Sequence, residues 1–193
     1  RLDGVLLNAG IVHPPKERRT TVDGDELVFA TNVLGHFALA AELLTVLSAA
    51  QGRMVWLGSI STSLWSYDLD DPQLRENYTG WRAYVQSKLA ATVLGVEAAR
   101  RLEEHGVPVK SVIAHPGYST GGRTEGIHGV NEPTRRKRFT ANLQAAITQS
   151  KERGAWPLVR ALADPCVESG ELWGPRFKTR GEPRKTELSK EAT

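Results

Sequence analysis

The sequence predicts an α/β fold in which helices flank a parallel sheet. Short apolar runs alternate along the chain with longer amphipathic segments, which is the pattern of β-α-β units. Small residues and turn formers follow three of the apolar runs, as expected where parallel strands end beside a ligand site. With 193 residues, 40% of them hydrophobic, the chain has enough apolar material for one domain with its own core.

Three apolar runs are the predicted central strands. They cover residues 5–7, 54–57 and 109–114, and they end at Asn8-Ala9-Gly10, Gly58-Ser59 and His115-Pro116-Gly117, respectively. The carboxyl ends of parallel strands lie at the same edge of a sheet, so we expect these three ends to form one rim. Leu172-Trp173 is predicted as a short last strand.

Amphipathic segments between these runs are the predicted helices, which cover residues 25–47, 81–104 and 155–163. Gly106 is expected to end the second of them. The polar segment 61–80 is predicted to be an irregular loop beside a site. Residues 1–175 are therefore assigned to one domain, and the Gly-, Pro- and charge-rich residues 176–193 to a loose polar tail.

Tyr84 and Lys88 are candidates for proton transfer. They are four residues apart on the second predicted helix, so both side chains leave the same face. A cation beside a phenol lowers the cost of ionising it, and such a phenol can serve as a general acid or base. An ordinary amphipathic helix that happens to carry one Tyr and one Lys is the alternative interpretation.

Several classes of protein are disfavoured by composition. No apolar run approaches the roughly 18 residues that span a bilayer, which predicts a cytoplasmic protein without a membrane partner. A net charge of +3 does not indicate nucleic-acid binding, and the basic run Arg135-Arg136-Lys137-Arg138 is interpreted as a solvated helix face. The single Cys166 cannot form an intramolecular disulfide, and no metal site is predicted because no His, Cys, Asp and Glu grouping has ligand spacing.

Five motifs in order give the chain a resemblance to a known family. They are Asn8-Ala9-Gly10, Thr31-Asn32-Val33-Leu34-Gly35-His36-Phe37, Arg53-Met54-Val55-Trp56-Leu57-Gly58-Ser59, Tyr84-Val85-Gln86-Ser87-Lys88 and His115-Pro116-Gly117-Tyr118. With these, residues 8–174 resemble the short-chain dehydrogenase/reductase family, and within it the bacterial members of the retinol-dehydrogenase-like branch. The resemblance implies a Rossmann-like doubly wound parallel sheet, of which this sequence holds the carboxyl-terminal portion, without the first three strands and the Gly-rich segment.

The resemblance also implies a role for each matched residue. Tyr84 would exchange a proton with the substrate oxygen, Ser59 would hydrogen-bond that oxygen, and Lys88 would hold the nicotinamide ribose and lower the pKa of Tyr84. Asn32 would support a water molecule that relays protons to Lys88. Cofactor-binding residues would be Asn8, Ala9, Gly10, Tyr84, Lys88, Pro116 and Gly117.

Some alternatives stay open at this level. Ser61 or Ser63 could take the place of Ser59, and Asn32 could be a polar residue satisfied by backbone. The cofactor is NAD or NADP, since no segment that would read the ribose 2′ position is recognised. Residues 5–7 are expected to form a strand with one unpaired, apolar edge, through which chains could associate.

Two functions are consistent with these observations. The first is an NAD(P)-dependent oxidoreductase that interconverts an alcohol and a carbonyl by hydride transfer, with a hydrophobic small molecule as substrate. The second is a truncated, catalytically inactive relative that binds a partner or dimerises. A homo-oligomer is expected by analogy with the family.

Overall fold

The computed structural model describes residues 1–64, 67–120 and 147–188. Within these residues the main sheet has five strands in the order β1-β2-β3-β6-β7. Their bounds are β1 Gly4–Leu7, β2 Arg53–Leu57, β3 Lys110–Ala114, β6 Leu172–Pro175 and β7 Pro183–Thr186. The first four strands are parallel, and β7 is antiparallel to β6. The predicted α/β fold with a parallel sheet is confirmed.

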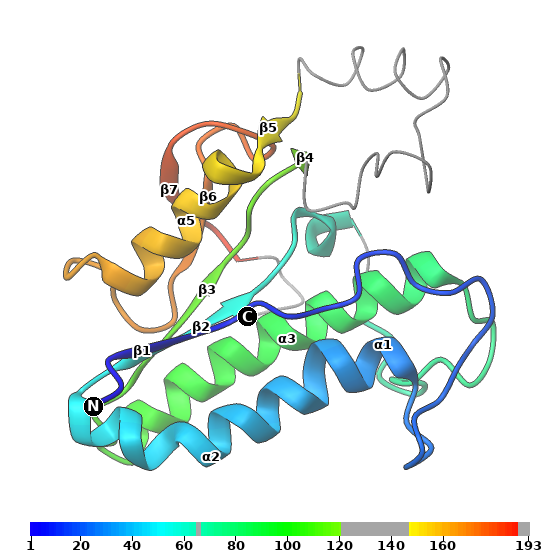
Figure 1. Ribbon diagram of the computed structural model, residues 1–193, viewed down its shortest axis with the longest axis horizontal. Coiled ribbons are helices and arrows are strands. Elements are labelled where there is room, and N and C mark those ends of the chain that lie inside the picture. Colours follow the sequence, from blue (N-terminus) through cyan, green and yellow to red (C-terminus); the bar gives the residue numbers. More distant parts are fainter. Residues whose placement is uncertain (65–66, 121–146, 189–193) are drawn as a thin grey trace, which may run out of the picture.

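Helices cover both faces of the sheet (Figure 1). One face packs against α2 (Gly35–Ala50) and α3 (Gly80–Glu104). Helix α1 (Leu27–Phe29) and a π-helical turn (Ala30–Leu34) lead into α2, and α1 packs against α3. The other face packs against α5 (Lys151–Ala163). Neighbouring β2 residues serve opposite faces, because side chains alternate along a strand: Met54 and Trp56 join the α2 and α3 core, and Val55 joins the α5 core.

Helix α3 lies close against β2 and β3 because Gly95 has no side chain. A Cβ atom at Gly95 would lie 2.8 Å from Cγ1 of Ile113 and 3.0 Å from the Trp56 ring. The buried Ser111 hydroxyl donates to the Gly95 carbonyl at 2.7 Å and accepts from the Trp56 ring nitrogen at 3.0 Å. This packing sets where the first turns of α3 lie relative to the strand ends.

Element boundaries differ from the sequence prediction at the ends of two helices: α2 ends at Ala50 rather than at residue 47, and α5 starts earlier than predicted. Helix α5 begins at Lys151, four residues before the predicted start, because the Ser150 side chain caps it by accepting from the Arg153 amide. A short 3₁₀ helix, Ile60–Leu64, lies in the segment that was predicted as irregular.

The polar tail expected from residue 176 is partly wrong. Residues Pro183–Thr186 form β7, which pairs through its backbone with β6, and Lys185 of β7 forms an ion pair of 2.8 Å with Glu171, just before β6. The sequence also gave no sign of a small second sheet formed by β4 (Ser119–Thr120) and β5 (Gln149–Ser150). These strands have no apolar alternation, so their pairing depends on backbone contacts between distant segments.

Strand β1 lies at one edge of the main sheet and pairs only with β2 in the part of the chain that the structure describes. The predicted unpaired edge is therefore present among these residues. The expected association of chains through it stays a prediction.

The helical run Leu27–Ala50 corrects the expectation that no apolar run could span a bilayer. Its 24 residues are long and apolar enough to do so, although the same helix also contributes Ala40 and Leu47 to the core. The core helices of soluble proteins can be equally long and apolar, so the run is weak evidence for a membrane segment. The predicted absence of a membrane partner is nevertheless without support, and the predicted cytoplasmic location stays a prediction.

Candidate active site

The ends of β1, β2 and β3 lie side by side at one edge of the sheet. Leu7 pairs with Trp56, and Trp56 pairs with Ile113, so the segments that follow these strands leave the sheet together. Asn8, Ala9 and Gly10 after β1 are exposed, and Pro116 and Gly117 after β3 are half-buried. The rim expected from the sequence exists and is accessible to a ligand.

Tyr84 and Ser59 meet at this rim. Ser59 follows β2, Tyr84 lies in the second turn of α3, and the Tyr84 hydroxyl donates to Ser59 Oγ at 3.2 Å. The Ser61 hydroxyl also donates to Ser59 Oγ, at 2.9 Å. Of the three serines considered as the partner of Tyr84, Ser59 is therefore in contact with it. Ser61 contacts Ser59, and the Ser63 side chain lies outside the described residues.

Lys88 lies one helical turn beyond Tyr84 and is buried, with 3% of its surface exposed. Its ammonium group donates to the Leu57 carbonyl at 3.0 Å, at the end of β2. Burial lowers the pKa of Lys88 from 10.5 to about 8, because the charged form loses its hydration. The site thus holds a weakly hydrated cation on the helix face that carries Tyr84.

Asn32 lies within the π-helical turn and is completely buried. Its Oδ1 accepts from the Ile11 amide at 2.8 Å, and its Nδ2 donates to the Ile11 carbonyl at 3.2 Å and to Ser87 Oγ at 2.9 Å. Ser87 in turn donates to the Tyr84 carbonyl at 2.8 Å. The side chain therefore ties the segment after β1 to the helix of Tyr84, and its amide is satisfied by backbone and Ser87.

Two buried histidines lie near these residues. Burial lowers the pKa of the His36 imidazole, and the nearby positive charge of Lys88 lowers it further. Burial lowers the pKa of His115 to about 4, and its Nδ1 accepts from the Gly117 amide at 3.2 Å. Both rings are therefore held as neutral imidazoles at neutral pH.

Comparison with known proteins finds dehydrogenases that are similar to this chain in sequence. Mouse polyprenol dehydrogenase is 38% identical over 167 residues, which are 83% of this chain and 48% of that protein. Human retinol dehydrogenase 14 is 40% identical over 180 residues, or 90% of this chain and 51% of that protein. The chain belongs to the short-chain dehydrogenase/reductase family. It spans about half the length of these relatives.

Comparison with solved structures finds a similar fold. The crystal structure of an uncharacterized protein from Mycobacterium paratuberculosis superposes with a TM-score of 0.74 at 31% identity, and covers 98% of this chain and 60% of its own. No family model matches the sequence. The predicted resemblance and the Rossmann-like architecture are both confirmed.

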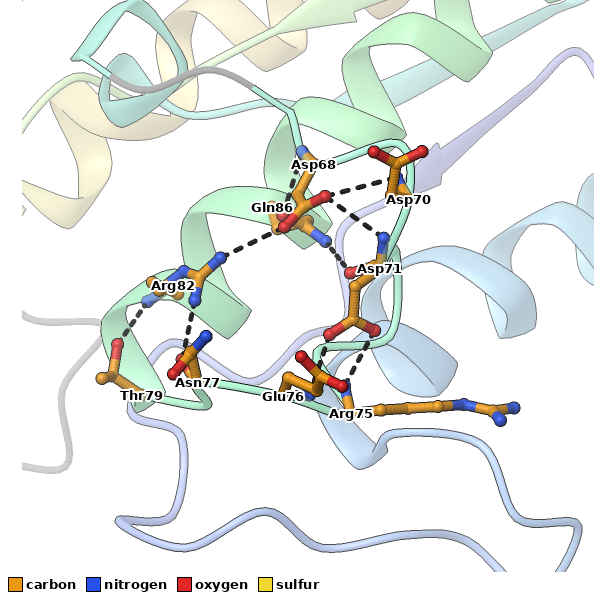
Figure 2. A network of polar contacts seen from close by, with 9 residues as sticks. All are labelled: Asp68, Asp70, Asp71, Arg75, Glu76, Asn77, Thr79, Arg82 and Gln86. Atoms are coloured by element: carbon orange, nitrogen blue, oxygen red, sulfur yellow. Dashed lines mark hydrogen bonds and ion pairs between the residues drawn. The ribbon is translucent and has the colours of Figure 1, made fainter.

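The segment between Ser59 and Tyr84 is anchored to α3 by residues that the motifs of the family did not indicate. Figure 2 shows the buried Gln86, whose side chain donates to the Asp71 carbonyl at 2.8 Å and accepts from the Asp68 amide at 3.3 Å. Arg82 donates to the Asn77 carbonyl at 2.8 Å and forms an ion pair with Asp68 at 3.3 Å. Arg82 and Gln86 are four residues apart, as Tyr84 and Lys88 are, but lie on another face of the helix. This spacing is the sequence feature from which a shared role of Arg82 and Gln86 could have been predicted.

Of the aromatic residues near Tyr84 in sequence, Trp81 lies beside its ring and Tyr78 bonds elsewhere. Trp81 is about half exposed, and its ring centroid lies 6.1 Å from that of Tyr84. The Tyr78 hydroxyl instead donates to the Pro15 carbonyl at 3.2 Å. Trp65 lies outside the described residues. Among the described residues, no group of three or more His, Cys, Asp and Glu side chains is arranged to hold a metal ion.

We expect Asn32→Ala to lower the free energy of unfolding by about 2–4 kcal/mol. The change leaves the Ile11 amide and carbonyl without the partner they have now, and a buried polar group without a partner costs about 1–3 kcal/mol. Urea denaturation measures the difference. Asn8→Ala, at an exposed position, is the matched control and should change stability by less than about 0.5 kcal/mol. Equal losses in the two variants would contradict the bridging role of Asn32.

Proposed function

We propose that this chain carries the proton-transfer part of an NAD(P)-dependent oxidoreductase that interconverts an alcohol and a carbonyl by hydride transfer. The observation that carries the proposal is the contact of 3.2 Å between the Tyr84 hydroxyl and Ser59 Oγ, with Lys88 one turn further along the same helix. The membership of the short-chain dehydrogenase/reductase family supports it.

Each residue has a role that follows from its chemistry. Ser59 and Tyr84 present two hydroxyl groups to one substrate oxygen, where negative charge develops when a carbonyl is reduced. Tyr84 gives its proton to that oxygen, and takes it back when an alcohol is oxidised. The Lys88 ammonium favours the ionised form of Tyr84 and can hold ribose hydroxyl groups. A bound nicotinamide supplies or accepts the hydride.

The rim formed by the strand ends fits a nicotinamide cofactor. Asn8, Ala9 and Gly10 offer exposed backbone and small side chains to an adenosine ribose, and Pro116 and Gly117 offer a narrow border to the nicotinamide. Either NAD or NADP is consistent with these residues. Since the similar proteins are a polyprenol dehydrogenase and a retinol dehydrogenase, we propose an apolar alcohol, or the matching carbonyl, as the substrate.

A panel of apolar aldehydes and ketones, assayed by oxidation of NADH and NADPH, tests the proposal with the full-length protein. Ser59→Ala should lower kcat/KM by about 10²- to 10³-fold, the usual effect of removing one donor to a developing oxyanion. Ser61→Ala is the matched control and should cost less than about tenfold, because Ser61 contacts the site through Ser59. A larger fall in kcat/KM for Ser61→Ala than for Ser59→Ala would show that Ser61, and not Ser59, is the serine that bonds the substrate oxygen.

The alternative of a binding or dimerising protein has one supporting observation. Phe37, Leu39 and Val46 of α2 are large apolar side chains with 56%, 45% and 46% of their surfaces exposed. A second copy of the chain would remove them from water, which supports the expected homo-oligomer. Self-association is compatible with the enzyme as well, so turnover in the carbonyl assay separates the two functions.

A further inference from the structure

The turn after β3 is held by partners from several directions. The His115 amide donates to the Trp173 carbonyl at 2.9 Å, the Gly117 amide to the His115 ring at 3.2 Å, and the Tyr118 amide to the Thr179 carbonyl at 2.7 Å. Pro116 lacks an amide hydrogen, so its carbonyl is its one backbone polar group. This turn is the border that the proposed function assigns to the nicotinamide.

Gln149, at the start of β5, supplies the partner of that carbonyl. Its side chain donates to the Pro116 carbonyl at 2.8 Å, and its Oε1 accepts from the Gly181 amide at 3.0 Å. Its own backbone amide donates to the Tyr118 carbonyl at 3.0 Å. The residue is 7% exposed, so these bonds form with little competition from water.

Gly181 and Thr179 belong to the loop between β6 and β7, which packs tightly on the same turn. A Cβ atom at Gly117 would lie 2.4 Å from the Thr179 carbonyl and 2.7 Å from Cγ of Pro175, and Gly117 has a φ of +66°. The turn therefore has little freedom on this side. Gln149 joins the loop between β6 and β7 to the Pro116 carbonyl, and thereby ties together segments that are 33 and 32 residues away from it in sequence.

We propose that Gln149 is a positioning residue for the cofactor: it bridges the Pro116 carbonyl and the loop between β6 and β7, and so holds the Pro116-Gly117 border in the conformation that accepts the nicotinamide. This inference rests on the proposed function. A border held in place before binding loses less freedom when the cofactor binds, so the bridge contributes to affinity without touching the reacting atoms.

Two variants of the full-length protein separate this role from a merely structural one. Gln149→Leu removes both hydrogen bonds of the side chain at similar size. Gln149→Glu can still accept from the Gly181 amide but, when ionised, cannot donate to the Pro116 carbonyl. Gln51→Leu makes the same substitution at an exposed glutamine after α2 and is the matched control.

NADH and NADPH are the probes, with dissociation constants from nicotinamide fluorescence and KM values for cofactor and carbonyl from steady-state kinetics. Both Gln149 variants should raise the Kd and KM of the cofactor by about tenfold or more, because each loses the hydrogen bond to the Pro116 carbonyl, while the carbonyl KM stays within about twofold. Gln51→Leu should match the wild-type protein in all of these values.

Unchanged cofactor affinity in the Gln149 variants would overturn the inference, even with a lower Tm, because the residue would then be purely structural. An equal rise in the carbonyl and cofactor KM values, or loss of the fold in both variants, would also count against it. A wild-type protein that binds neither nucleotide would overturn the proposed function itself, and the inference with it.

Discussion

Tyr84→Phe should lower kcat of the full-length protein by about 10²- to 10⁴-fold, the usual contribution of a positioned general acid or base. The substitution removes the Tyr84 hydroxyl, which donates to Ser59 Oγ at 3.2 Å, and keeps the ring that packs near Trp81. Stability and cofactor affinity should therefore stay close to the wild-type values. Oxidation of NADH or NADPH with the best carbonyl of the panel measures the rate, and thermal melting monitors the fold.

Tyr78→Phe is the matched control for this experiment. Its hydroxyl donates to the Pro15 carbonyl and makes no contact with Ser59, so its loss should leave kcat within about twofold of the wild-type value. If Tyr84→Phe turned over carbonyls as fast as the wild type, the assignment of Tyr84 as the proton donor would be refuted. An inactive wild-type protein would instead favour the binding or dimerising alternative.

Lys88→Met should abolish most of the activity and yet not destabilise the protein at pH 7. Burial lowers the pKa of Lys88 from 10.5 to about 8, which corresponds to about 3 kcal/mol of cost for holding the charged group in the folded protein. Methionine avoids that cost, although it leaves the Leu57 carbonyl without the Lys88 donor at about 1–3 kcal/mol. A functional residue that costs stability is a familiar compromise in active sites.

The sign of the pH dependence follows from the same pKa. Between about pH 8 and 10.5 the unfolded chain holds a proton at Lys88 that the folded protein has already lost, so this lysine makes the wild type more stable as pH rises through that window. Below pH 8 both states are charged there, and the full cost applies. Relative to Lys88→Met, the wild type should therefore gain up to about 3 kcal/mol between pH 8 and 10.5.

Urea denaturation without cofactor at pH 7.5 and near pH 10 measures this difference. Lys16→Met, at an exposed position, is the control, and should change the free energy of unfolding by less than about 0.5 kcal/mol at either pH. Parallel pH profiles for the wild type and Lys88→Met would contradict a cost of burying this charge.

Local patterns were sufficient for the elements that position the site. The period of apolar residues indicated β2 and α3 to within one residue, and the four-residue spacing of Tyr84 and Lys88 placed both on one helix face. Ser59 at the end of β2 followed from the rule that parallel strands end at one edge. These properties depend on neighbours in sequence, and can therefore be predicted without knowledge of the fold.

Contacts between distant segments were beyond such patterns. The bonds of Asn32 to Ile11 and Ser87 join residues 21 and 55 positions apart, and those of Gln149 cross 33 and 32 positions. Composition predicts a loose tail where β7 lies, because residues 176–193 are rich in Gly, Pro and charged residues, whereas the pairing of β7 with β6 uses backbone groups that every residue carries. A polar side chain in a sequence does not reveal which buried partner will satisfy it.

The sequence by itself determined the strands β1, β2, β3 and β6 with the long helices between them, the family, and the residue types available for proton transfer, because periodicity and motif spacing are local properties of the chain. The tertiary structure alone decided that Ser59 rather than Ser61 meets Tyr84, that burial lowers the pKa of Lys88, and that Gln149 braces the turn after β3. Those outcomes depend on how α3, β3 and the loop between β6 and β7 pack, since burial and hydrogen-bond geometry arise only when distant segments come together.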